Sequence, residues 1–326
     1  MATAQQVKAL IESYTERDPD RFLSVASQIA AHAAKTGKKR LAEDLRKLVD
    51  EARRMQVTQT EKTRSIPIAQ PTGELAGLVA ASFPKTRFAD MVLDEQLEQR
   101  LRRVLVEYRQ AGRLHANGLA PRRKLLLLGP SGCGKSMTAA ALAGELSLPL
   151  LTVQFHTLIT KFMGETAAKL RLVFDAISKS RGVYLFDEFD AIGAHRHGGQ
   201  DVGEIRRVLN SFLIFLEQDD SASLIIAASN LEASLDAALF RRFDDTLHYG
   251  LPSRAMAKEL IENRLSNFDI KRLGWKSILS VTNGMSHADI VKACEEAAKQ
   301  AVLEERRTIL TPELKRELSQ RRRSSD

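Results

Sequence analysis

The residues GPSGCGKS, from Gly129 to Ser136, have the spacing of a phosphate-binding loop. They follow a predicted strand and open a predicted helix, which is the context that this motif needs. Glycines let such a loop curl so that its backbone N–H groups point at phosphate oxygens, and the helix N-terminus adds partial positive charge. We expect Lys135 to contact the β- and γ-phosphates of a nucleoside triphosphate and Ser136 to bind Mg²⁺.

A second motif, VYLFDE, ends a short apolar run with two adjacent acids, Asp187 and Glu188. Ligands of open α/β sheets bind at the carboxyl ends of the strands. We expect Asp187 to hold Mg²⁺ through its water shell and Glu188 to act as the general base that polarises the attacking water. Acids at this place can also simply cap the next helix, so the upstream phosphate-binding loop is what favours the catalytic interpretation.

A third apolar run ends in AASN and brings Asn230 to the same predicted edge of the sheet. The Asn230 amide can hydrogen-bond the attacking water or the γ-phosphate. The alternative is an asparagine that only forms a turn.

The order of apolar runs and helical segments predicts an α/β domain over residues 87–252. Helical segments separate these runs, which predicts parallel strands buried on both faces of a sheet. Residues 1–55 are typical of about three short amphipathic helices, residues 56–86 of a polar linker with prolines, and residues 253–326 of further helices. The four apolar runs are residues 124–129, 149–153, 182–188 and 223–230.

Composition narrows the class of protein. Of the 326 residues, 44% are hydrophobic and 28% charged, as in an ordinary globular protein. No apolar run approaches the roughly 18 residues of a membrane span, and no secretion signal precedes the helices. The two cysteines, Cys133 and Cys294, are too few for a disulfide framework. We therefore expect a cytoplasmic protein. The net charge of +8 comes largely from pairs of Lys and Arg residues scattered along the chain. This distribution favours a solvated surface over a nucleic-acid-binding groove.

Together these motifs resemble the AAA family of ATPases, within the AAA+ superfamily, from about Arg87 to Arg307. GPSGCGKS and LFDE match the family's Walker A and Walker B motifs, IIAASN matches its sensor-1 strand, and RFADMV looks like the segment whose backbone holds adenine. The resemblance implies ATP and Mg²⁺ as ligands. The nucleotide-binding residues that it implies are Asp90, Met91, Val92, Gly129, Pro130, Ser131, Gly132, Cys133, Gly134, Lys135, Ser136 and Met137.

The segment LDAALFRRFDD resembles the family's second region of homology, which supplies arginine fingers to the neighbouring subunit. The resemblance implies that Arg242 joins Glu188 and Asn230 in catalysis, and it implies a ring, usually a homo-hexamer. The alternative for Arg241 and Arg242 is ordinary surface charge. The sequence departs from the family in three places. Asp245 stands where many members carry a second arginine, His287 replaces the family's glycine before AD, and the usual PG insertion before the finger is missing.

In this family, the loop after the second strand carries an aromatic–hydrophobic pair and a glycine into the central pore. The residues of this chain at the corresponding positions are Lys161, Phe162, Met163 and Gly164. The implied function is Mg²⁺-dependent ATP hydrolysis that drives remodelling or unfolding of a protein substrate. Without the resemblance, Phe162 and Met163 would be interpreted as core residues.

The resemblance implies an α/β fold, a P-loop NTPase with a parallel five-stranded sheet flanked by helices, plus a C-terminal helical lid and an N-terminal helical bundle. The arrangement is similar to single-module bacterial AAA ATPases encoded beside subtilisin-like serine proteases, which implies such a protease as a partner in a toxin–antitoxin or defence pair. Two alternatives stay open. One is an ATP-switched nucleic-acid-binding helper, although we find no helix-turn-helix or zinc-finger signature; the other is a regulatory ATPase that does not thread its substrate.

Overall fold

The computed structural model describes residues 43–44, 47–48, 73–154, 158, 165–192, 202–231, 235 and 237–325. The chain divides into two units, Met1–Ile68 and Ala69–Asp326. In the first unit only residues 43, 44, 47 and 48 are described, and they are helical. The predicted N-terminal bundle therefore lies almost wholly outside the described residues, whereas the second unit contains the predicted nucleotide site.

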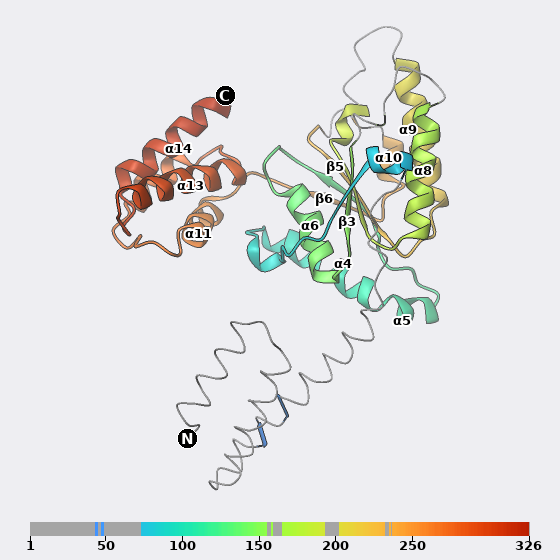
Figure 1. Cartoon of the computed structure of the whole chain (residues 1–326), viewed down its shortest axis with the longest axis horizontal. Coiled ribbons are helices and arrows are strands. Elements are labelled where there is room, and N and C mark those ends of the chain that lie inside the picture. Colours follow the sequence, from blue (N-terminus) through green and yellow to red (C-terminus); the bar gives the residue numbers. More distant parts are fainter. Residues whose placement is uncertain are drawn as a thin grey trace. The chain divides into compact units, whose positions relative to one another are not determined.

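A six-stranded sheet forms the centre of the second unit (Figure 1). Its spatial order is β1-β3-β4-β5-β2-β6, and each neighbouring pair is parallel except β1 with β3. Strand β2 therefore lies between β5 and β6. The strands are β1 (Val79–Ser82), β2 (Lys124–Leu128), β3 (Leu150–Gln154), β4 (Val183–Asp187), β5 (Leu224–Ser229) and β6 (Asp245–His248).

The prediction of a parallel five-stranded sheet is wrong, because the sheet has six strands and is mixed. The additional strand β1 runs antiparallel at the edge, a common addition to an otherwise parallel sheet. It also lies within residues 56–86, so the linker prediction does not hold for Val79–Ser82. This four-residue segment, VAAS, has one buried side chain, Val79, which is too short and weak a pattern to indicate a strand.

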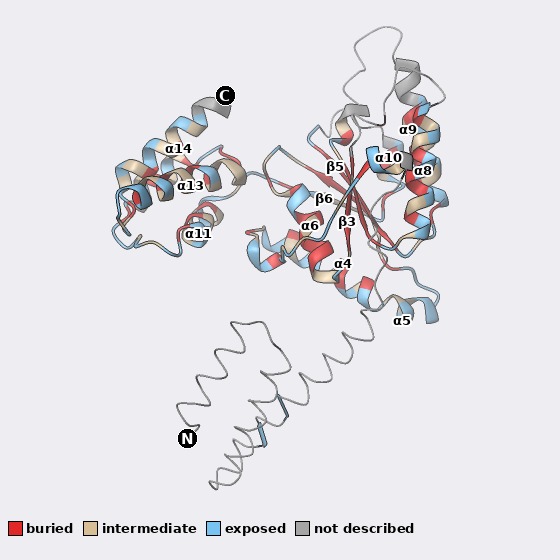
Figure 2. Ribbon diagram, viewed as in Figure 1, coloured by how far each residue is buried: buried red, intermediate tan, exposed pale blue. Residues whose placement is uncertain are grey.

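Both faces of the sheet are buried, as the continuous apolar runs predict. Along β2, Leu126 and Leu128 pack into one hydrophobic core, and Leu125 and Leu127 pack into a second. Helices α8 and α9 contribute to the first core and α4 and α6 to the second (Figure 2). These helices are α4 (Glu95–Arg109), α6 (Lys135–Leu146), α8 (Glu165–Lys179) and α9 (Val202–Gln218).

The C-terminal helices have a hydrophobic core of their own. Ile261, Ile278, Ile290 and Leu314 are fully buried in it, each from a different helix. The four helices are α11 (Arg254–Arg264), α12 (Trp275–Val281), α13 (His287–Leu303) and α14 (Thr311–Ser325).

Short helices complete the described ranges. They are η1 (Gly73–Gly77), η2 (Phe88–Asp90), α5 (Ala111–Ala116), η3 (Phe189–Ile192) and α10 (Ala237–Phe240). Within these ranges no helix combines the length and the apolar character needed to cross a bilayer.

Candidate functional site

The phosphate-binding loop joins the end of β2 to the start of α6, as predicted. Gly129 (φ 145°) lies so close to Tyr249 that a Cβ would come within 2.2 Å of the Tyr249 carbonyl oxygen. Gly132 (φ 74°) faces the start of α13, where a Cβ would lie 2.6 Å from the Ser286 Oγ. Only glycine fits both the backbone angle and the space at these two positions, so the loop conformation depends on them.

Lys135 lies beneath the loop with its ammonium group surrounded by oxygen atoms. Its Nζ donates hydrogen bonds to the carbonyl oxygens of Gly129 (2.6 Å) and Pro130 (2.9 Å) and to the Asn230 Oδ1 (2.8 Å). The side chain is buried, and this burial lowers the pKa of the Lys135 ammonium from its ordinary value. The Lys135 ammonium group therefore links Gly129, which follows β2, to Asn230, which follows β5. When a nucleotide binds, the same ammonium group can exchange these carbonyl oxygens for phosphate oxygens.

Ser136 and Asp187 meet at the same edge of the sheet. The Ser136 Oγ donates a hydrogen bond to the Asp187 Oδ2 over 2.7 Å. A hydroxyl beside a carboxylate is a set of hard oxygen donors that fits Mg²⁺, an ion that keeps several waters and needs few protein ligands. The described residues contain no cluster of three or more His, Cys, Asp or Glu side chains suited to a metal.

Glu188 follows the last residue of β4 on a left-handed turn of the backbone, with φ 53°. Such a conformation is unfavourable for a residue other than glycine and is found at functional sites more often than elsewhere. Phe189 is fully buried directly after it, and the Glu188 N–H donates to the Asp187 Oδ1 over 3.0 Å. These contacts hold the turn and leave the Glu188 carboxylate exposed on the wall of a cavity.

The cavity has a volume of about 840 Å³, which suits a ligand the size of a nucleotide. Its walls bring together every predicted residue of the nucleotide site except Gly129 and Pro130, whose carbonyls instead hold Lys135. The predicted residues on the walls are Asp90, Met91, Val92, Ser131, Gly132, Cys133, Gly134, Lys135, Ser136, Met137, Asp187, Glu188 and Asn230.

The other part of the lining was not predicted and comes mainly from the C-terminal helices. A backbone hydrogen bond from the Ala288 N–H to the Gly132 carbonyl, 3.0 Å long, attaches the start of α13 to the phosphate-binding loop. No chemical motif marks these residues, and the sequence singles out only His287, which replaces the family's glycine before AD. The lining residues in question are Leu260, Asn263, Arg264, Ser266, His287, Ala288 and Val291.

Arg242 is not among the residues that line this cavity. It follows α10, and its guanidinium forms an ion pair with Glu217 at 3.3 Å in which both side chains are largely exposed. An exposed pair of this kind contributes little stability and exchanges easily. Of the residues predicted to be catalytic, Glu188 and Asn230 lie on this cavity wall and Arg242 does not.

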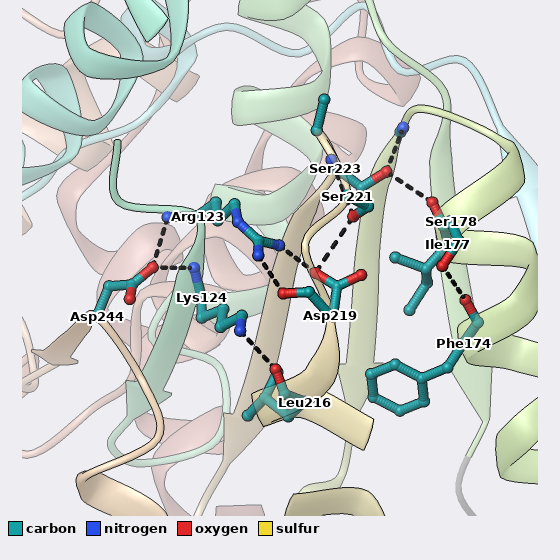
Figure 3. Close-up of polar contacts among 12 residues, drawn as sticks. Arg123, Lys124, Phe174, Ile177, Ser178, Leu216, Asp219, Ser221, Ser223 and Asp244 are labelled. Carbon is teal, nitrogen blue, oxygen red and sulfur yellow. Dashed lines mark hydrogen bonds and ion pairs between the residues drawn. The ribbon is translucent and has the colours of Figure 1, made fainter. Parts of the chain in front are cut away.

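Two aspartates anchor the segment that carries Arg242, and Figure 3 shows the contacts of the first, Asp244. The Asp244 Oδ2 accepts hydrogen bonds from the backbone N–H groups of Arg123 (2.8 Å) and Lys124 (2.9 Å), and Arg123 in turn pairs with the buried Asp219. Asp245 forms ion pairs that hold the start of β6. Its partners are Arg100 and Arg122.

The predicted pore-loop residues, Lys161, Phe162, Met163 and Gly164, lie outside the described residues. In the chain they fall between β3, which ends at Gln154, and α8, which begins at Glu165.

Comparison with known proteins identifies the family. The sequence model of the family "ATPase family associated with various cellular activities (AAA)" matches residues 125–251, from β2 to just beyond β6. A Sinorhizobium fredii protein, "Uncharacterized AAA family ATPase y4kL", is 34% identical over 322 residues, which cover 98% of this chain and 95% of that protein. The chain belongs to the AAA family of ATPases. The chain is therefore an ATPase.

Other relatives of this AAA ATPase are longer proteins. "ATP-dependent zinc metalloprotease FtsH 4" of Sphaerobacter thermophilus is 30% identical over 70% of this chain, which spans only 36% of that protein. "Proteasome-activating nucleotidase" of Thermococcus onnurineus is 32% identical over 68% of this chain and 57% of its own length. A solved structure, "Crystal structure of FIGL-1 AAA domain", superimposes with a TM-score of 0.61 at 23% identity over 78% of this chain and 88% of that one, which shows a shared fold.

Proposed function

We propose that this AAA ATPase uses Mg²⁺-dependent ATP hydrolysis in a homo-hexameric ring to remodel or unfold a protein substrate. The observation that carries the proposal is the meeting of Lys135, Ser136, Asp187, Glu188 and Asn230 on one cavity. Lys135 and the loop amides would hold the triphosphate, and Ser136 and Asp187 would hold Mg²⁺, which supplies charge neutralisation at the β- and γ-phosphates.

Within this site each remaining residue has a distinct task. Glu188 would accept the proton of the attacking water, because its carboxylate is fixed by the turn after β4 and reaches the cavity. Asn230 would orient that water or the γ-phosphate while its Oδ1 keeps Lys135 in place. Asp90, Met91 and Val92 line the same cavity and would hold the adenine.

Arg242 would act on the ATP of the neighbouring subunit. Its exposed pair with Glu217 leaves it free to exchange partners, and Asp244 and Asp245 fix the segment that carries it. With an aspartate where many members carry a second arginine, Arg242 would serve as a single finger. The protein-remodelling role is supported by the relatives named for proteolysis and for proteasome activation.

The substrate would be gripped by Lys161, Phe162, Met163 and Gly164 in the central pore. A ring of exposed aromatic side chains can hold an extended polypeptide without reading its sequence. A subtilisin-like serine protease is the partner that we propose for the processed or regulated substrate. The proposed location is the cytoplasm, and no observation on the described residues favours the nucleic-acid alternative.

Mixing of subunits tests the ring and the finger together. We expect Arg242→Ala to lose about 10³-fold in ATP turnover, and Lys135→Ala to be inactive because it cannot bind ATP. A mixture of the two should regain activity, because Lys135→Ala subunits offer an intact Arg242 to neighbours that bind ATP. Arg241→Ala is the matched control and should stay active; a wild-type rate for Arg242→Ala alone would refute the finger.

A further inference from the structure

Gly144 is buried in the last turn of α6 and does not line the nucleotide cavity. A Cβ at this position would lie 2.1 Å from the Thr86 carbonyl oxygen, 2.5 Å from the Arg87 Nη1 and 3.2 Å from the Pro84 carbonyl oxygen. Residues 84–87 therefore rest directly on the backbone of α6. Only a residue without a side chain allows this close approach.

The helix itself does not explain a glycine at this position. Glycine is among the least favourable residues inside a helix and alanine is the most favourable. Helix α6 carries alanine at four other positions, including Ala143, the residue before Gly144. The contact with residues 84–87 is therefore the structural reason for Gly144.

The segment that rests on Gly144 leads directly into the wall of the cavity. Arg87 precedes the short helix η2, and its N–H donates to the Asp90 Oδ2 over 2.8 Å, while the Asp90 N–H donates to the Arg87 carbonyl oxygen over 3.0 Å. Phe88 is buried in the second hydrophobic core, to which α6 also contributes. This compact turn would transmit a shift at Gly144 to Asp90 and Met91, which line the cavity.

Helix α6 thus supports two walls of the cavity. Its first residues, Lys135 and Ser136, follow the glycines of the phosphate-binding loop, and its last turn carries Gly144. Near the loop, a Cβ on Gly134 would lie 3.5 Å from the Met91 Cε, so Met91 lies beside the loop as well. One helix therefore sets the spacing between the loop that suits the triphosphate and the segment that suits the base.

We propose that Gly144 is a positioning residue, which fixes where the nucleobase is held relative to the triphosphate. The inference rests on the proposed function in one respect, that Asp90, Met91 and Val92 hold the adenine. Because Cβ atoms are essentially never found within 3.0 Å of such an atom, an alanine at position 144 would have to displace the Thr86 carbonyl oxygen from 2.1 Å to at least 3.0 Å. The displacement reaches the adenine wall and leaves the phosphate-binding loop, at the other end of α6, in place.

Binding of ATP and of inorganic tripolyphosphate, which has neither base nor ribose, tests the proposal on the full chain. Both ligands are titrated against wild type, Gly144→Ala and the matched control Gly112→Ala, where nothing lies within 4 Å of the new Cβ. We expect Gly144→Ala to bind ATP about tenfold more weakly and tripolyphosphate as wild type does, because only ATP uses the displaced wall. Gly112→Ala should bind both ligands as wild type does. In turnover, Gly144→Ala should raise the KM for ATP and leave kcat unchanged.

A second variant, Phe88→Leu, decides the matter if Gly144→Ala does not fold. It keeps an apolar side chain in the second core but loosens the same turn, so it should also weaken binding of ATP and spare tripolyphosphate. An equal loss for both ligands, or no loss for ATP, would overturn the positioning role. If wild type bound ATP no more tightly than tripolyphosphate, the result would instead contradict the proposed adenine site on which the inference rests.

Discussion

Ser136 and Asp187 come from segments that lie 51 residues apart in the chain, yet the Ser136 Oγ donates to the Asp187 Oδ2 over 2.7 Å. The contact is possible because β2 and β4 both flank β5 with parallel register, so their carboxyl ends reach the same edge. The pair places a hydroxyl and a carboxylate where a cation can be held beside the phosphate-binding loop. It is the structural basis for the proposed Mg²⁺ site.

Changing this pair should alter the dependence on Mg²⁺. We expect Ser136→Ala and Asp187→Asn each to need about tenfold more Mg²⁺ for half-maximal ATP turnover, because each loses one charge-assisted contact of roughly 1.4 kcal/mol. The measurement is the turnover rate as a function of Mg²⁺ at saturating ATP. Ser131→Ala, in the same loop, is the control and should keep the wild-type dependence; an unchanged dependence in both test variants would remove the pair from the metal site.

Gly132 should be intolerant of a side chain. An alanine there meets both the left-handed backbone, φ 74°, and the Ser286 Oγ at 2.6 Å, so Gly132→Ala should lower the free energy of unfolding by about 1–3 kcal/mol. Chemical denaturation measures the loss. The matched control is Gly112→Ala in α5, where nothing lies within 4 Å and the substitution should be neutral or slightly stabilising. Similar stabilities for the two variants would show that α13 does not rest against the loop.

His287 should make the stability of the protein depend on pH in the mildly acidic range. Burial holds its folded-state pKa below the unfolded value of about 6.5. As pH falls through 6.5 toward the folded pKa, the unfolded chain takes up a proton that the folded chain does not, so the free energy of unfolding decreases. Above that window the residue has no effect.

The comparison is between wild type and His287→Gln, with the free energy of unfolding measured from pH 7.5 to 5.5. Wild type should lose more stability over this range than the variant. Asp94 and His248 line the smaller cavity with His287 and are present in both proteins, so any effect that they have is common to both curves. Parallel curves would show that His287 is not buried as neutral imidazole.

The sequence predicts those parts of the site whose residues are contiguous and whose strands are apolar along their length. GPSGCGKS, LFDE and AASN each carry their own signal, and the parallel order of the strands is enough to bring Lys135, Asp187 and Asn230 together. The direct contact of Lys135 with Asn230 could not be predicted, because it depends on side-chain geometry across neighbouring strands.

No sequence motif marks the residues that form the rest of the cavity wall. Arg264 and Val291 belong to ordinary amphipathic helices, and their place on the cavity follows from how the C-terminal helices meet the loop. His287 appeared in the sequence only as a departure from the family pattern. Strand β1 was missed because Val79–Ser82 is short and only partly buried at the edge of the sheet.

Glu188 provides the most direct test of the central claim, that ATP is hydrolysed in this cavity with Glu188 as the general base. The measurement is ATP binding and ATP turnover by Glu188→Gln beside wild type. The side chain keeps its shape but cannot accept the proton, so the variant should bind ATP with wild-type affinity and turn it over about 10²-fold or more slowly. Turnover by Glu188→Gln at the wild-type rate would contradict this assignment.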